Sequence, residues 1–227
     1  MPELDFLVEG VEVARYAATP LLKFKLRVVN AGAEEEIANV MLQCQIQIEA
    51  ARRRYEPVEQ HGLLELFGEP ERFGQTVKTT LWLHASVLIP AFQGSCLVDI
   101  PVPCSFDFNV VATKYFYALE TGEVPLSFQF SGSVFYRGEN AALQVSQIAW
   151  SKEAGFRLPV AVWQEMMDHY YPNSAWLCLN REVFDRLYRY KMQRGLPTWE
   201  QALESLFDAV EEPGAVEESD LVEEKVP

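Results

Sequence analysis

The sequence has few of the residues and motifs that mark most enzymes and metal proteins. It contains four cysteines, none of them in a CxxC pair, and three histidines that are far apart in the sequence. No GxSxG, Walker or GxGxxG motif follows a predicted strand. From these absences we predict a protein that is not an enzyme and that holds no cofactor.

Basic residues are also scarce. The chain has 19 lysines and arginines against 33 aspartates and glutamates, a formal net charge of −14. Binding to nucleic-acid phosphates requires clusters of basic side chains, so we expect no nucleic-acid partner. Seven acids and one base fall within residues 211–227, where no aromatic residue occurs. That composition predicts a disordered acidic tail.

Long apolar runs are missing as well. No window approaches 18 uninterrupted apolar residues, so no membrane insertion is expected. Residues 1–10 lack the basic and then apolar order of a secretory signal. These features and the unpaired cysteines lead us to expect a cytoplasmic protein with reduced thiols.

What the chain does contain is a repeated alternation of apolar and polar residues. Leu22–Val28, Gln43–Glu49 and Ser127–Val134 each alternate with the period of two that a half-buried strand requires. Strands followed by turns at a spacing of about ten residues favour an all-β sandwich over βαβ units. We therefore predict a mainly β fold, an antiparallel immunoglobulin-like β-sandwich over residues 1–150.

The expected strands cover most of that region, with one short helix, Glu59–Phe67, between the third and the fourth. The strands are predicted at Leu4–Val13, Leu22–Val28, Ile37–Glu49, Thr76–Ile89, Ser95–Val102, Asp107–Tyr117, Val124–Tyr136 and Ala142–Trp150.

The pattern changes to a helical one after Trp150. Asn180 is a suitable N-cap and Gly195 a suitable C-cap for the middle helix of three. The three helices are predicted at Val160–Tyr170, Arg181–Arg194 and Trp199–Val210. We expect residues 151–210 to form a helical C-terminal unit packed on the sandwich, followed by the tail at 211–227.

Two pairs of residues could contribute metal ligands. Glu165 and His169 are four residues apart on a predicted helix and therefore share a face. Cys96 and Cys104 are eight residues apart and could meet across a hairpin. A closed zinc site needs four converging ligands, which neither pair supplies alone. The structural alternatives are a helix-surface ion pair for the first pair and buried thiols for the second.

Large aromatic residues are frequent in the C-terminal part of the chain, where the three helices are predicted. Three short helices cannot hide that much aromatic surface among themselves, so we expect it to dock on the sandwich or on a partner protein. An aromatic groove that holds a small ligand between sandwich and helices is a further possibility. The residues predicted to bind a partner are Trp163, Tyr170, Tyr171, Trp176 and Trp199.

Several segments resemble an uncharacterised bacterial protein family whose members are often encoded in [NiFe]-hydrogenase gene clusters. The segments are LVDIPVPCSFDF, KYFYAL, GEVPLSFQFSGSVFY, LQVSQIAWSKE, FRLPVAVWQEMMDHYYP and LPTWEQAL, and the resemblance as a whole extends from about Phe6 to Phe207. The family has no assigned activity, so the resemblance implies no catalytic residue. It implies an accessory or maturation-linked role beside a hydrogenase, with a hydrogenase subunit or a maturation factor as partner.

Two function classes follow. The leading hypothesis is a non-catalytic interaction or accessory protein, associated with a [NiFe]-hydrogenase system, that binds a protein partner through an aromatic surface. The alternative is a metal- or small-ligand-handling protein that uses Cys96, Cys104, Glu165 and His169, or the aromatic groove.

Overall fold

The computed structural model describes residues 2–31, 36–138 and 142–211, and it is mainly β, with antiparallel sheets and several helices. The chain divides into two compact units, Met1–Ala175 and Trp176–Pro227. All the strands belong to the first unit, and each unit is described by itself below.

The first unit contains two antiparallel sheets. The first sheet has the order β1-β2-β5, and the second has the order β4-β3-β6-β7 with β8 also paired to β6. The strands are β1 (Leu4–Val13), β2 (Leu21–Asn30), β3 (Ile37–Ile48), β4 (Thr80–Ile89), β5 (Ser95–Pro103), β6 (Glu123–Arg137), β7 (Leu143–Gln147) and β8 (Glu153–Pro159).

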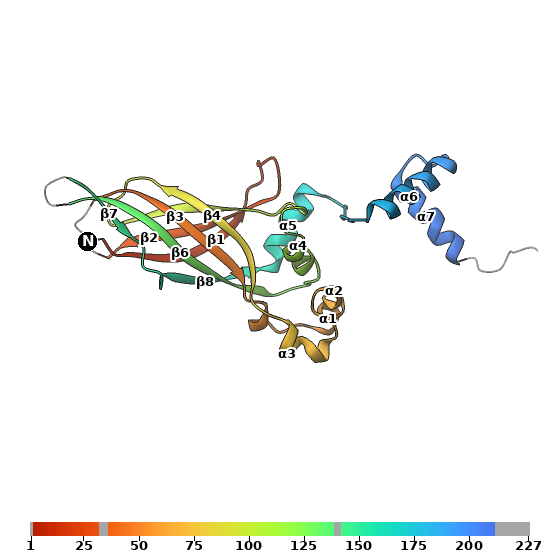
Figure 1. Cartoon of the computed structure of the whole chain (residues 1–227), viewed down its shortest axis with the longest axis horizontal. Helices are drawn as coiled ribbons and strands as arrows, with labels where there is room; N and C mark the ends of the chain where they lie inside the picture. Colours follow the sequence, from red (N-terminus) through yellow and green to blue (C-terminus); the bar gives the residue numbers. More distant parts are fainter. Residues whose placement is uncertain (1, 32–35, 139–141, 212–227) are drawn as a thin grey trace, which may run out of the picture. The chain divides into compact units, whose positions relative to one another are not determined.

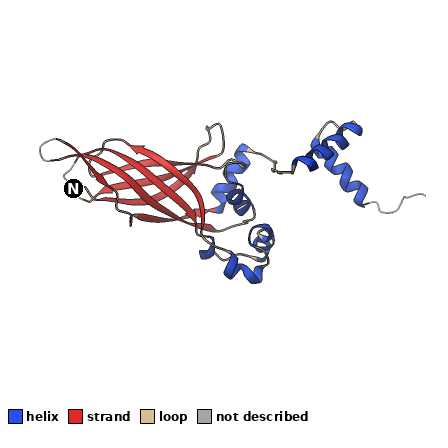
Figure 2. Cartoon of the chain, in the orientation of Figure 1, coloured by secondary structure: helices blue, strands red, loops and turns tan. Residues whose placement is uncertain are grey.

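The core lies between the two sheets, which pack face to face (Figure 2). Phe24 on β2 meets Phe128 on β6 edge to face, with ring centroids 5.2 Å apart. Phe6 on β1 stacks on Phe130 of β6 at 4.4 Å. The alternation seen in the sequence produces this core, because every second residue over most of β2 and β3 is buried.

The outer faces of the two sheets differ in chemistry. On the first sheet, Lys25 donates to Glu12 at 2.6 Å and to Asp99 at 2.7 Å, so its charges are paired across strands. On the second sheet, Ser86 donates to Gln43 at 2.9 Å. That face carries neutral polar side chains together with exposed apolar ones, such as the cross-strand pair Met41 and Leu88.

The helices described in the first unit, α1 to α5, gather at one end of the sheets (Figure 1). The short helices lie between β3 and β4, α4 joins β5 to β6, and α5 follows β8 directly. Their bounds are α1 (Pro57–Gly62), α2 (Leu64–Phe67), α3 (Phe73–Thr76), α4 (Val110–Tyr117) and α5 (Val160–Tyr170), with 3-10 turns at Ala50–Arg52 and Pro70–Arg72.

The segment Asp107–Tyr117, predicted as a strand, is helical in its larger part. The Asn109 side chain accepts a hydrogen bond from the Ala112 amide at 3.0 Å and so caps α4. Tyr115 and Phe116 on the following turn are buried. The β-branched and aromatic composition favoured a strand, but the cap and the burial of one helical face decide the outcome.

The boundary predicted at residue 150 is also corrected. Glu153–Pro159 forms β8, because its residues pair with β6, and so this stretch is not part of a helical unit. Helix α5 belongs to the same compact unit as the sheets, and the second unit begins at Trp176. Of the predicted tail at 211–227, only Glu211 lies within the described residues, and it ends α7.

The described part of the second unit contains two helices, α6 (Arg181–Gln193) and α7 (Trp199–Glu211), close to their predicted positions. The Asn180 side chain accepts from the Glu182 amide at 3.0 Å, which confirms the predicted cap. Gly195 has a φ of 64°, as expected of a residue that ends a helix. None of the helices in the described ranges combines the length and the apolarity that a membrane crossing requires.

Candidate functional site

Helix α5 holds the loop between β1 and β2 in place. The Tyr170 hydroxyl donates to the Ala14 carbonyl and accepts from the Ala17 amide at 3.1 Å. His169 Nε2 donates to the Arg15 carbonyl at 3.0 Å. Two adjacent side chains of α5 therefore hold the loop backbone at three residues, Ala14, Arg15 and Ala17.

An ion pair completes this attachment. The Arg15 guanidinium donates to the Glu165 carboxylate at 2.5 Å, and both side chains are more than half exposed. Glu165 and His169 thus share a face of α5, as their spacing predicted. They contact the same loop residue, Arg15, through its side chain and its carbonyl group.

Tyr16 lies between these fixed points and is fully exposed, at 102% of its reference area. Beside it is a surface hollow of about 430 Å³. The hollow is lined by Glu12, Val13, Ala14, Arg15, Tyr16, Ala17, Leu21 and Lys23. We call residues 14–20, together with this hollow, the Tyr16 loop.

The opposite face of α5 is fixed in the core. Val160 and Met166 are fully buried, and Trp163 is 4% exposed. The indole of Trp163 stacks on the ring of Phe116 at 5.5 Å, with an interplanar angle of 17°. Trp163, predicted as a partner-binding residue, is therefore a core residue that docks α5 on α4.

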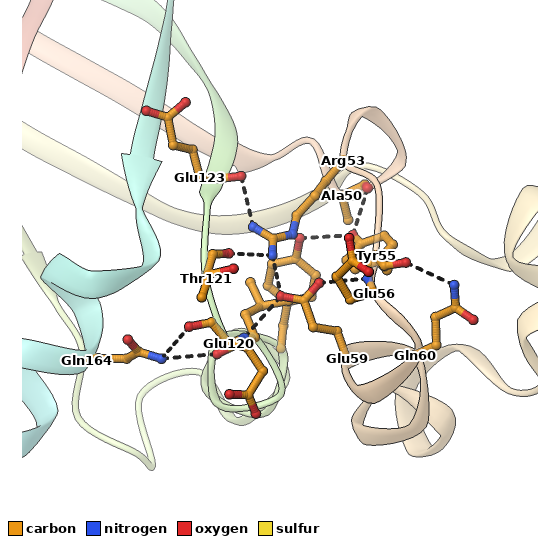
Figure 3. A network of polar contacts seen from close by, with 12 residues as sticks. Ala50, Arg53, Tyr55, Glu56, Glu59, Gln60, Glu120, Thr121, Glu123 and Gln164 are labelled. Atoms are coloured by element: carbon orange, nitrogen blue, oxygen red, sulfur yellow. Dashed lines mark hydrogen bonds and ion pairs between the residues drawn. The ribbon is translucent and has the colours of Figure 1, made fainter.

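A buried ion pair lies at the same end of the unit (Figure 3). Arg53 and Glu59 pair with side chains only 7% and 2% exposed. Arg53 also donates to the Thr121 carbonyl at 2.7 Å and to the Glu123 carbonyl at 3.0 Å. The Arg53 guanidinium thereby ties the segment after β3 to the chain that enters β6.

This pair is linked to α5 through one backbone residue. Glu59 accepts from the Glu120 amide at 3.0 Å, and Gln164 of α5 donates to the Glu120 carbonyl at 3.2 Å. Gln164 also donates to the Leu119 carbonyl at 3.2 Å. The buried pair therefore helps to position the helix that holds the Tyr16 loop.

Two phenols complete the network. The Tyr55 hydroxyl donates to the Ala50 carbonyl at 2.7 Å and lies 2.9 Å from the Tyr115 hydroxyl. Burial raises the pKa of both phenols, so both stay neutral at physiological pH. Because these hydroxyls bond to each other and to the backbone, the network holds segments together.

The candidate metal ligands do not converge. Cys96 lies on β5 and Cys104 directly follows it, so eight residues of extended chain separate them by roughly 26 Å. Burial raises the pKa of the Cys104 thiol to about 12 and also raises that of Cys96. Glu165 and His169 bind the Tyr16 loop instead. Within residues 2–31, 36–138 and 142–211, no three His, Cys, Asp or Glu side chains cluster in a way that could hold a metal ion.

The seam between the sheets and the helices is filled by side chains. Trp82, Phe116 and Trp163 meet there, and the depression that they line with Cys104 leaves no room for a water molecule. The aromatic groove suggested by the sequence is therefore packed as core at this position.

The other predicted partner-binding residues have different positions. Tyr170 is half-buried under the Tyr16 loop, and Tyr171 is half-buried at the end of α5. Trp176 is 53% exposed in the second unit. Trp199 lies 5.2 Å from Phe184 and packs between α7 and α6.

Arg15 and Tyr16 were missed by sequence reasoning. Residues 14–20 contain alanines, a threonine and a proline between two alternating strands, which indicates a turn. A tyrosine at the tip of a turn has no core face to occupy, and this signal could have marked Tyr16. The contacts of Arg15 with α5 involve residues about 150 positions away, which no local pattern reveals.

Comparisons with known proteins give one significant family match. The model described as "Family of unknown function (DUF6084)" matches residues 1–215. A search of curated proteins finds no match.

Solved structures show only a weak likeness. A late embryogenesis abundant (LEA) protein is 14% identical over 70% of this chain and 73% of its own, with a TM-score of 0.31. Beta-glucosidase 3B from Thermotoga neapolitana is 11% identical over 69% of this chain and 17% of its own, with a TM-score of 0.25. A protein assigned as ApaA from Bordetella pertussis is 13% identical over 69% of this chain and 93% of its own, with a TM-score of 0.23. At these scores the likeness carries no argument about function.

Proposed function

The chain belongs to the DUF6084 family, whose function is unknown, and we propose that it is a non-catalytic interaction protein that binds another polypeptide. The observation that carries the proposal is the Tyr16 loop. Its tyrosine is fully exposed, while the backbone on both sides is held by α5.

A loop of this kind is suited to protein recognition for two reasons. Tyrosine and arginine are enriched among the residues that dominate binding energy at interfaces, and Arg15 and Tyr16 are adjacent. The loop is also ordered before binding, so a partner does not bear the entropic cost of fixing it. The neighbouring hollow gives a partner side chain a place to insert.

The charges around the loop favour a protein partner over a small charged ligand. Arg15 pairs with Glu165, Glu12 with Lys25, and Lys23 lies 3.6 Å from Asp99. A surface with mixed and paired charge resembles the polar rim of an interface, with Tyr16 as the apolar anchor within it.

We further propose that the partner is a subunit or a maturation factor of a [NiFe]-hydrogenase in the bacterial cytoplasm. The support is the resemblance of six sequence segments to a family encoded beside such enzymes. The proposal makes the protein an accessory factor that presents the Tyr16 loop to the hydrogenase system.

The scaffold that we infer for this role is an immunoglobulin-like sandwich. The strand orders β1-β2-β5 and β4-β3-β6-β7 correspond to the orders A-B-E and C′-C-F-G of that architecture. In such sandwiches the loops cluster at the two ends and carry the binding residues. The Tyr16 loop would be one of these end loops.

Affinity purification of the tagged full chain from its native host tests the partner. Enrichment of a hydrogenase subunit or maturation protein over an untagged control is the expected result. If other proteins are enriched and none of these, the hydrogenase assignment is wrong and the interaction proposal stands. If no protein is enriched by a chain that is folded by circular dichroism, the interaction proposal itself is contradicted.

A further inference from the structure

The described part of the second unit, residues 176–211, has almost no core of its own. It contains one cysteine, Cys178, which is free. Among its described residues only Ala202 is buried.

Both helices carry apolar stripes that the other helix covers only in part. On α6, Phe184 is 44% and Met192 59% exposed, and Tyr188 lies between them on the same stripe. On α7, Phe207 is 63% and Val210 75% exposed. Two 13-residue helices with such stripes gain most of their stability by burying them.

The two helices have opposite charge. Helix α6 has four basic and two acidic residues, whereas α7 has four acidic residues and no basic one. In the described part of the chain, no ion pair joins the two helices. On α6, Arg186 and Arg189 border a surface hollow of about 340 Å³ with Tyr190 and Gln193. On α7, Glu200, Glu204 and Asp208 recur at every fourth position, which places them in one row.

We infer that this unit associates with the same unit of a second copy, so that α6 of each chain lies against α7 of the other. A twofold interface brings the same pair of surfaces together twice, and one basic and one acidic helix per chain suit that symmetry. The resulting four helices bury the apolar stripes, and the charged rows flank them as in other helical associations.

A second copy fits these surfaces better than an anionic membrane or nucleic acid. Such a partner would be attracted by α6 and repelled by the acidic row on α7. A second copy instead presents an acidic helix to α6 and a basic helix to α7. The inference is independent of the Tyr16 loop, which lies in the other unit.

Charge reversal tests the inference in the full chain. One variant carries Arg186→Glu and Arg189→Glu, and the other carries Glu204→Arg and Asp208→Arg. In a homodimer of either variant, α6 and the α7 that it contacts carry charges of the same sign. We therefore expect the dissociation constant of that homodimer to rise by roughly tenfold or more. When the two variants are mixed, α6 of each chain faces an α7 of opposite charge at both contacts, so they should form a heterodimer of near wild-type affinity.

Analytical ultracentrifugation of each protein and of the mixture gives the readout. Circular dichroism confirms that the helices are retained in both variants. Arg54→Glu with Arg72→Glu, two exposed residues of the first unit, is the matched control and should leave the dimer unchanged. A monomeric wild-type chain, a dimer that both reversals leave intact, or a mixture that fails to associate would each overturn the inference.

Discussion

Arg53 and Glu59 form an ion pair that is almost completely withdrawn from solvent, with side chains 7% and 2% exposed. Each charge also bonds to the backbone of the β6 entry, through Thr121 and Glu120. The pair is therefore the point where three segments of the first unit join, and Gln164 of α5 bonds to the same residue, Glu120, as Glu59 does.

Removing one member of this pair should strongly destabilise the protein. Arg53→Met leaves the Glu59 carboxylate buried without its cation, and we expect a loss of about 3–5 kcal/mol in the free energy of unfolding. Arg53→Met with Glu59→Leu should cost much less than the sum of the single changes. The exposed pair of Arg52 and Glu49 is the control, and Arg52→Met should cost less than about 1 kcal/mol. Urea denaturation measures the free energy of unfolding of each variant. Equal losses of stability in Arg53→Met and Arg52→Met would contradict the claim that Arg53 forms a buried ion pair.

Gly132 should not tolerate a side chain. Its φ is 135°, and a Cβ atom there would lie 2.0 Å from the Met41 carbonyl oxygen on the neighbouring strand. Gly132→Ala therefore forces β3 and β6 apart, and we expect a loss of several kcal/mol, large enough to lower the yield of folded protein. Gly10→Ala is the control, because nothing lies within 4 Å of a Cβ atom there. Thermal melting that shows the two variants equally stable would contradict the register of β3 and β6.

The four cysteines should differ in reactivity in a predictable order. Cys178 is exposed, whereas Cys44 and Cys104 are buried with pKa values raised to about 12 by desolvation. A thiol reagent at pH 8 should modify Cys178 quickly and the two buried thiols only after unfolding, since the thiolate is the reactive form. Mass spectrometry of the labelled peptides measures the rate at which each cysteine is modified. Fast labelling of Cys104 in the native protein would show that the core at the end of β5 is open.

The sign of the same pKa shifts predicts how stability depends on pH. A thiol with a raised pKa in the folded state contributes its full stabilisation below the unfolded value of about 9 and loses it as the pH rises towards 12. The free energy of unfolding should therefore fall between pH 9 and 12. Cys44→Ala with Cys104→Ala should make that fall shallower, and an unchanged slope would contradict the burial of both thiols.

Tyr170→Phe should loosen the Tyr16 loop without unfolding the sheets. The change removes the hydroxyl that bonds to Ala14 and Ala17, at a cost of about 1 kcal/mol. Amide hydrogen exchange should become faster in residues 14–20 and stay constant in β3 and β6. Tyr117→Phe serves as the control, because Tyr117 is 72% exposed at the end of α4. Unchanged exchange in the loop would show that α5 does not hold it.

Local patterns predicted much of this fold. Alternation located β1, β2, β3, β5 and β6 to within a few residues, and the Asn180 and Gly195 caps located α6. Local patterns failed where a long-range contact decides the structure. Residues 110–117 look like a strand but become a helix whose Tyr115 and Phe116 fill the core, and β8 forms because β6 offers it an edge.

The candidate site was only half predictable for the same reason. The spacing of Glu165 and His169 correctly placed them on one face of a helix, yet only the tertiary structure brings Arg15 to that face. The basic character of α6 was also missed, because its arginines are interspersed with acidic and apolar residues and form no run in the sequence.

The measurement that tests the central claim most directly is the affinity of the partner for two single variants of the first unit. Tyr16→Ala should weaken binding of the purified partner by roughly 30-fold or more, the effect of a hot-spot residue worth about 2 kcal/mol. Trp150→Ala removes another aromatic side chain that is 93% exposed, and it should bind like the wild type. Isothermal titration calorimetry with a purified hydrogenase component, or with the partner identified by affinity purification, gives both dissociation constants. Equal affinity of Tyr16→Ala and the wild type would contradict the proposal that the Tyr16 loop is the binding surface.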